Sequence, residues 1–146
     1  MVEIKNNALI IDGETKNLNN INIINGKNNF VYFSNNMLER IKNYPYPIEE
    51  IYALIKKAGL NNFWFVNNKI ININNIQKVY IKYYQYAGLS IIESLRINAE
   101  TCVVNIECVN GRTESISFSS DKEAEKFYHE LDNRIIESKC TEGIKV

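Results

Sequence analysis

The chain has few of the residues that build catalytic and metal centres. It contains one histidine, and no Cys-His grouping has zinc-ligand spacing, which argues against a structural zinc site. Its six glycines form neither a dinucleotide-binding nor a phosphate-loop motif. The sequence therefore predicts no cofactor, no metal ligand and no catalytic residue. The few residues with such chemistry are His129, Cys102, Cys108, Cys140, Asp12, Asp121 and Asp132.

Most of these residues have a structural explanation in the pattern around them: Asp12 lies in a turn, Asp121 at a helix start and Asp132 on a helix surface. His129 lies among charged neighbours, off the apolar stripe of a predicted helix, as a solvated surface histidine would. Cys102 and Cys108 fall on the apolar face of one predicted strand, which suits inert core thiols rather than nucleophiles. We therefore expect a protein that is not an enzyme. A small enzyme that uses carboxylates remains an alternative, because paired carboxylates leave no local signature.

An excess of positive charge is also absent. The chain has 17 basic and 17 acidic residues, and its formal net charge is zero. Only four of the basic residues are arginine, the side chain best suited to bidentate phosphate and guanine contacts. Proteins that bind duplex nucleic acid usually carry a marked excess of Lys and Arg, so general duplex recognition is not expected.

No segment has the apolar run of a signal peptide or of a membrane span. The three cysteines are sparse and odd in number, which fits a reducing compartment. The sequence therefore predicts a cytoplasmic location and no membrane partner. Asn and Ile occur 23 times each, and their A- and T-rich codons suggest a low-GC bacterium or one of its mobile elements.

With 146 residues and 45% hydrophobic content, the chain has the size and composition of one globular domain, 1–146. Its first third alternates short apolar runs with Asp12-Gly13 and Asn25-Gly26, which are strong hairpin-turn signals. A central helix pair is expected next. The first helix is capped near Asn35 or Asn36, and the second begins around Pro47 and ends at Gly59.

The segments Ala8–Ile24 and Phe63–Val79 resemble each other within the chain. Each has four apolar residues, a two-residue turn and then an Asn-apolar-Asn-Asn-Ile core. If this similarity is a true repeat, the chain contains two related β-hairpin units; the alternative is coincidence in an Asn- and Ile-rich sequence.

The last third predicts a β-hairpin followed by an amphipathic helix. Residues 102–108 and 113–118 alternate in polarity, and a three-residue loop, Val109-Asn110-Gly111, keeps their apolar residues on one face. That register pairs Val104 with Ile116 and Cys102 with Phe118. A capping box at Ser120–Glu123 then starts the helix, and the tail after about Glu137 is expected to be flexible. The predicted fold class is α+β: a mainly antiparallel sheet, a central helix pair and a long C-terminal amphipathic helix.

The most informative pattern lies in Gln77–Tyr86. In a strand, alternate side chains point to the same face, so one face would carry Lys78, Tyr80, Lys82, Tyr84 and Tyr86. The other face would carry Val79, Ile81, Tyr83 and Gln85, which suits a core. We predict that the first face is the partner-binding surface. A structural alternative is that its tyrosines cover the sheet or meet a helix within the domain.

Two kinds of partner fit this face. Tyrosine offers a large contact area with little rotamer entropy to lose, which favours a protein partner or self-association. The neutral net charge ranks that choice first, and the chain is expected to act as a non-enzymatic binding protein, such as a small inhibitor or immunity-type protein of a mobile element. The alternative is a single-stranded nucleic-acid-binding domain, in which bases stack on tyrosine and lysine neutralises phosphate.

The segment Phe63–Ile76 resembles the strand-turn-strand of LytTR-type DNA-binding domains. In that family apolar residues lead into a Val-Asn-apolar motif, which corresponds here to Ile71-Asn72-Ile73. The family presents Arg, His and Arg to DNA, where this chain has Trp64, Val66 and Asn67. Because the departure falls on the DNA-contacting residues, the resemblance does not by itself carry the family's function to this chain.

Overall fold

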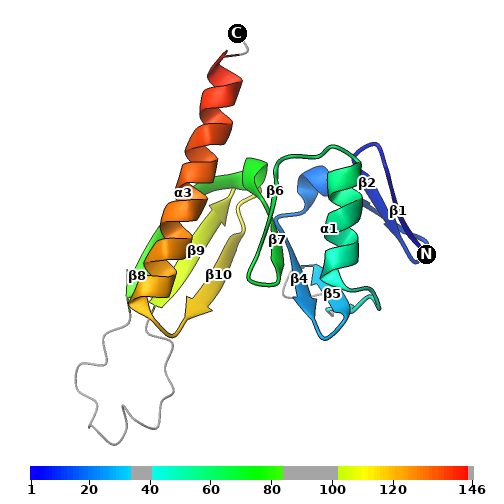
Figure 1. Ribbon diagram of the computed structural model, residues 1–146, viewed down its shortest axis with the longest axis horizontal. Helices are drawn as coiled ribbons and strands as arrows, with labels where there is room; N and C mark the ends of the chain where they lie inside the picture. The colour runs from blue at the N-terminus through cyan, green and yellow to red at the C-terminus, as the bar shows by residue number, and fades with distance from the viewer. Residues whose placement is uncertain (34–40, 84–101, 145–146) are drawn as a thin grey trace, which may run out of the picture. The chain divides into compact units, whose positions relative to one another are not determined.

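The computed structural model describes residues 1–33, 41–83 and 102–144, with side chains as far as 138. The chain divides into two compact units, Met1–Asn75 and Ile76–Val146 (Figure 1). The single domain expected from the length of the chain stays a prediction.

The first unit contains two antiparallel sheets and one helix. The first sheet is a meander in the order β1-β2-β3, with strands β1 (Val2–Lys5), β2 (Ala8–Ile11) and β3 (Glu14–Asn17). The second has the order β5-β4-β7-β6, with β4 (Ile23–Lys27), β5 (Phe30–Phe33), β6 (Phe63–Val66) and β7 (Lys69–Asn72). Residues from both sheets and the helix α1 (Ile48–Lys57) form one apolar core.

Helix α1 begins and ends as its sequence predicts. Pro47 is the N-cap, and acidic residues follow in the first turn, where they complement the positive end of the helix. The glycine after the C-cap, Gly59, has a left-handed φ of 78°. The buried face carries Ile48, Ile51 and Ile55 at helical spacing.

The hairpin turns of this unit use residues that tolerate positive φ. Asp12-Gly13, Asn28-Asn29 and Asn67-Asn68 each have both central residues at positive φ, as a type I′ turn requires. The prediction of a turn at Asn25-Gly26 is wrong, because both residues lie in β4 and the chain turns three residues later, at Asn28-Asn29.

Packing explains the glycine in β4. A Cβ built on Gly26 would lie 2.7 Å from a side-chain carbon of Ile48 in α1. Gly26 therefore permits the close approach of the helix to the strand, a role that glycine can have inside a strand.

The second unit is a three-stranded antiparallel sheet in the order β10-β9-β8 with a helix on one face. Its elements are β8 (Ile76–Tyr83), β9 (Cys102–Cys108), β10 (Thr113–Phe118) and α3 (Asp121–Ile144). The predicted hairpin register is confirmed: Val104 pairs with Ile116 and Cys102 with Phe118, and Gly111 has a φ of 86°.

Helix α3 buries an apolar stripe against this sheet, and Figure 1 shows it lying along the strands. The Phe127 ring lies 5.3 Å from the ring of Phe118 in β10. The backbone stays helical to Ile144, through the region where the sequence predicts a flexible tail. The stripe consists of Ala124, Phe127, Leu131 and Ile135.

The predicted α+β class, with mainly antiparallel strands and a long C-terminal helix, is confirmed. Helix α1 is the second helix of the predicted central pair. The first predicted helix falls mainly on residues 34–40, outside the described part of the chain. Among the described residues, no helix combines the length and apolar character needed to cross a membrane.

The two similar segments have the same order of local structure. In each, a hairpin with a two-residue turn is followed by a short 3-10 helix, η1 (Leu18–Asn20) or η2 (Ile73–Asn75), and then by another strand. The side chain of Asn17 accepts a bond from the backbone N–H two residues later, and Asn72 does the same. A common origin for the two segments stays a prediction.

Candidate nucleic-acid interface

Strand β8 carries the alternation that its sequence predicts. Lys78, Tyr80 and Lys82 are exposed, whereas Val79 and Ile81 between them are half-buried on the helix side. An irregularity between Ile76 and Lys78 shifts the pairing with β9 by one residue, so the regular register begins at Lys78. Tyr84 and Tyr86 of the predicted surface lie outside the described residues.

The register of the sheet identifies the neighbours of these three residues. Residues directly opposite each other in antiparallel strands share a face, and β9 and β10 therefore complete three rows on the side away from α3. We call these nine residues the outer face. They are Lys82, Val103 and Ser117 in one row, Tyr80, Asn105 and Ser115 in the next, and Lys78, Glu107 and Thr113 in the last.

The centre of the outer face is held in place by short-range contacts. The Lys78 ammonium lies 5.4 Å from the centre of the Tyr80 ring, a cation–π distance. The Ser115 hydroxyl donates to the side-chain oxygen of Asn105 at 2.7 Å. Asn105 and Val103 of the middle strand are buried, each 9% exposed, so the accessible side chains of the outer face belong mainly to β8 and β10.

The opposite side of the sheet is engaged with α3. The Tyr83 hydroxyl donates to the Glu125 carboxylate at 3.0 Å, and this bond raises the pKa of Tyr83. The Cys102 thiol donates to the carboxylate of Asp121 at 2.7 Å. Tyr80 and Tyr83 are thus two exposed tyrosines of one strand with different roles, because only the second contacts the helix.

Charge is distributed unequally over the second unit. The outer face carries two lysines and one carboxylate, Glu107. Between residues 121 and 138, α3 carries six acidic and three basic side chains. A polyanion would therefore meet less repulsion at the outer face than at the helix. The acidic residues of α3 in that range are Asp121, Glu123, Glu125, Glu130, Asp132 and Glu137.

The other chemically capable residues have the surroundings expected of structural groups. Cys102 and Cys108 are buried, reduced thiols, and burial raises the pKa of Cys108 to about 11, with the Glu114 charge acting in the same direction. His129 is exposed beside the ring of Tyr128. In the described part of the chain, no three His, Cys, Asp or Glu side chains are grouped as metal ligands would be.

Two carboxylates of the first unit bind tyrosine hydroxyls. Tyr46 donates to Asp12, and this bond is the main cause of the lowered pKa of Asp12. Glu14 accepts from the Lys42 ammonium at 2.7 Å and from Tyr44 at 2.8 Å, and its pKa is also lowered. Both carboxylates are therefore biased towards the ionised form, which does not suit a general acid.

Sequence reasoning missed the residues of β9 and β10 that share the outer face. The polar positions of both strands were visible in the alternation, and the hairpin register that pairs Asn105 with Ser115 follows from the predicted loop. The pairing of β8 with β9 had no comparable signal, because a long segment separates the two strands and no turn of known length sets their register.

The comparisons with known proteins place few constraints on the chain. No protein-family model and no curated protein matches it. A solved structure that is similar is the LytTr DNA-binding domain of a methyl-accepting/DNA response regulator from Bacillus cereus. The identity is 14%, the TM-score is 0.45, and the match covers 90% of this chain and 94% of that domain.

This comparison corrects one sequence-based prediction. The expected inhibitor or immunity-type protein that binds a partner protein is contradicted, because the similar structure is a DNA-binding domain; the nucleic-acid alternative agrees with it better. A likeness this distant specifies no ligand, so the ligand of this chain has to be inferred from its own residues.

The positions at which the sequence departs from LytTR-type domains have structural roles here. Trp64 is 6% exposed in β6, and Asn67 is the first residue of the turn before β7, with a φ of 50°. Val66 is half-buried at the end of β6. Trp64 and Val66 are therefore poor candidates for a nucleic-acid surface, whereas Asn67 is exposed.

Proposed function

We propose that this protein binds single-stranded nucleic acid through the outer face of its second unit. The observation that carries the proposal is the exposed row Lys78, Tyr80 and Lys82 on the side of β8 that α3 leaves uncovered.

The chemistry of this row suits a single strand. Every base has a flat face that can stack on a tyrosine ring, and such stacking contributes about 1–3 kcal/mol per base. Tyr80 is 36% exposed, which makes its ring accessible to a base. Lys78 and Lys82 lie two residues away on either side, where they can neutralise the phosphates that flank the stacked base.

Electrostatics favours a single strand over a duplex. Duplex DNA carries one charge per about 1.7 Å, and its tight binders therefore make many phosphate contacts. The outer face has two lysines, no arginine and one opposing carboxylate, so it can neutralise few phosphates. The neutral net charge of the chain agrees with weak electrostatic attraction and with affinity that depends mainly on stacking.

Other features of the proposal follow from the same residues. A stacking surface needs no cofactor and no catalytic group, so the protein is proposed not to be an enzyme. Two buried cysteines in the reduced form suit a reducing compartment, which supports the proposed cytoplasmic location.

The test is a binding titration of the full chain with fluorescent single strands of about a dozen nucleotides, within the range that such surfaces cover. Tyr80→Ser should weaken binding by about tenfold, which corresponds to the loss of one stacked base. Tyr83→Ser is the matched control, because it removes a tyrosine of the same strand from the helix side. Equal effects of the two substitutions, or no binding by the unaltered chain, would reject the proposal.

The charged residues give a second, independent readout. For a single strand, each neutralised phosphate contributes about −0.7 to the slope of log K against log salt. Lys78→Gln and Lys82→Gln should each make the slope shallower by about that amount. Glu107→Gln removes the opposing carboxylate and should strengthen binding, whereas Lys126→Gln on α3 should leave the slope unchanged.

A further inference from the structure

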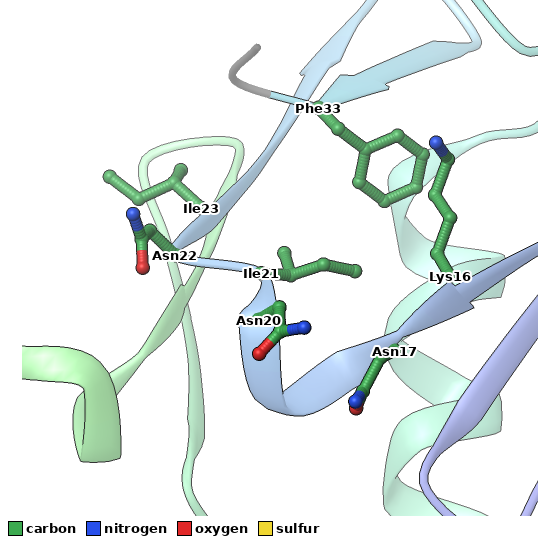
Figure 2. A pocket seen from close by; sticks show the side chains of 7 residues that line it. All are labelled: Lys16, Asn17, Asn20, Ile21, Asn22, Ile23 and Phe33. Carbon is green, nitrogen blue, oxygen red and sulfur yellow. The ribbon is translucent and has the colours of Figure 1, made fainter. Parts of the chain in front are cut away.

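A small pocket in the first unit lies beside the junction of β3, η1 and β4, with Phe33 of β5 on its far side (Figure 2). Its volume is about 180 Å³. An engineered cavity of about 150 Å³ lined by apolar side chains holds benzene, which sets the scale for an occupant. The lining residues are Lys16, Asn17, Asn20, Ile21, Asn22, Ile23 and Phe33.

The polar residues of this pocket differ in their availability to a ligand. The Asn17 side chain is occupied as the cap of η1, where it accepts from the Asn19 N–H at 3.0 Å. Asn22 accepts a bond from Asn75. Asn20, in contrast, is exposed and makes no side-chain hydrogen bond to the described part of the chain. Its carboxamide can therefore turn towards a bound molecule.

Lys16 supplies a positive charge at the edge of the pocket. Its ammonium lies 4.8 Å from the centre of the Phe33 ring and has no ion pair with a described residue. The nearby Glu14 is already bound by Lys42 at 2.7 Å. Lys16, Lys42 and the N-terminal ammonium outnumber the carboxylates of Glu14 and Asp12 by one, so an anionic group is favoured over a cationic one.

The remaining wall is apolar. In Figure 2 the Ile21 side chain and the Phe33 ring face the same space as Lys16. Phe33 is 5% exposed and is held edge-on against Tyr44 at 5.5 Å, so the wall is preformed. Four of the seven lining residues are polar and three are apolar, so the pocket offers one apolar wall beside several groups that can orient a ligand.

We infer that this pocket binds a small organic anion, with its flat or branched apolar body against Ile21 and Phe33 and its carboxylate at Lys16 and Asn20. This inference is independent of the proposed nucleic-acid function, since its residues belong to the first unit and the outer face belongs to the second.

Benzoate is a suitable probe, because it combines a benzene-sized body with one carboxylate. We expect saturable amide chemical-shift changes in the isotope-labelled full chain, confined to residues 16–23 and 33, with a Kd on the order of 1 mM for so small a ligand. Changes that are scattered over both units, or that do not saturate, would overturn the inference.

Variants and analogues test each part of the site separately. Lys16→Gln should weaken benzoate binding by about fivefold, and neutral benzyl alcohol should bind the unaltered protein more weakly by a similar factor. Lys56→Gln on α1 is the matched control and should change nothing. If Lys16→Gln retains the native amide spectrum and full benzoate affinity, or if inorganic phosphate binds as tightly as benzoate, the proposed ligand class is wrong.

Discussion

The two similar segments, 8–24 and 63–79, show how one local pattern serves in two settings. Both contain a hairpin, a 3-10 helix and an asparagine that caps it. The second strand of the first segment, β3, ends the order β1-β2-β3, whereas the corresponding strand β7 lies between β4 and β6. The edge strand reads Glu-Thr-Lys-Asn and the central one Lys-Ile-Ile-Asn. The position of each strand in its sheet, rather than the turn, thus explains the difference in polarity.

The capping asparagines differ most. Asn17 is exposed and makes one capping bond. Asn72 is 1% exposed, and its amide nitrogen donates to the backbone oxygens of Leu18 and Ile21. Its side-chain oxygen accepts from Asn62 and from the backbone of Asn74. Asn72 therefore joins the two segments, and Asn17 stabilises only its own turn.

The largest expected effect comes from removing this junction. Asn72→Ala removes four hydrogen bonds and leaves the Asn62 amide and the Asn74 N–H without this acceptor, although the Leu18 and Ile21 carbonyls each keep another donor. It should lower the free energy of unfolding by about 3 kcal/mol. Asn17→Ala should cost about 1 kcal/mol, as for a lost cap. Urea unfolding of both variants measures the difference; equal losses would show that the two asparagines have equivalent roles.

A substitution at Gly26 tests how closely β4 packs against helix α1 and against the turn of the β6-β7 hairpin. Its backbone N–H donates to the Asn68 carbonyl at 2.9 Å, and its carbonyl accepts from the Asn68 side chain at 2.7 Å. Gly26→Ala would force a Cβ against Ile48, and overpacking of this kind costs about 1–3 kcal/mol. Thermal unfolding should show the loss, and Gly26→Ala with unchanged stability would mean that α1 shifts freely.

Substitutions in the turns of the β2-β3 and β6-β7 hairpins should change the free energy of unfolding by a smaller amount. Gly13 has a φ of 82°, and no described atom would crowd a Cβ there, so Gly13→Ala should cost about 1 kcal/mol from backbone strain alone. Asn68 occupies the corresponding position at a φ of 59°. Asn68→Gly relieves strain but loses the bond to Gly26, so its net effect on unfolding should be close to zero. A large change in stability on Asn68→Gly would show that one of these opposing effects dominates.

The smallest expected effect is a difference between the two hairpins in their response to low pH. Glu14 follows the first turn and binds Lys42 and Tyr44, whereas Lys69 follows the second turn and binds Asn25. Because the pKa of Glu14 is lowered from 4.5 in the folded state, its stabilising contribution is present above that value and is lost as the pH falls below it. Amide shifts between pH 6 and pH 3 should therefore move more in 8–17 than in 63–72. Glu14→Gln should reduce that excess and leave the part caused by Asp12, whose pKa is also lowered; an excess that is unchanged in Glu14→Gln would show that Glu14 does not contribute to it.

Much of the fold was accessible from sequence because its signals are local. The limits of α1, the three-residue loop before β10 and the helical stripe of α3 each follow from residues close together in the chain. The error at Asn25-Gly26 has the same origin. Asn-Gly is a strong turn signal, but here the glycine is required by the helix packed against it, which no neighbouring residue reveals.

The candidate surface could likewise be predicted from the sequence only in part. The alternation of Lys78, Tyr80 and Lys82 was predictable, since side-chain direction in a strand depends only on position in the chain. Which face α3 covers, and which residues of β9 lie beside Tyr80, required the structure.

By itself, the sequence determined the turn at Asp12-Gly13, the loop before β10, the start of α1 and which side chains of β8 share a face, since these properties depend on backbone preferences over a few residues. The tertiary structure decided that Asn72 is buried, that Gly26 lies against Ile48 of α1, and which residues lie next to Tyr80 on the outer face. Those properties depend on contacts between segments distant in the chain, whose pairing is set by the packing of the whole unit.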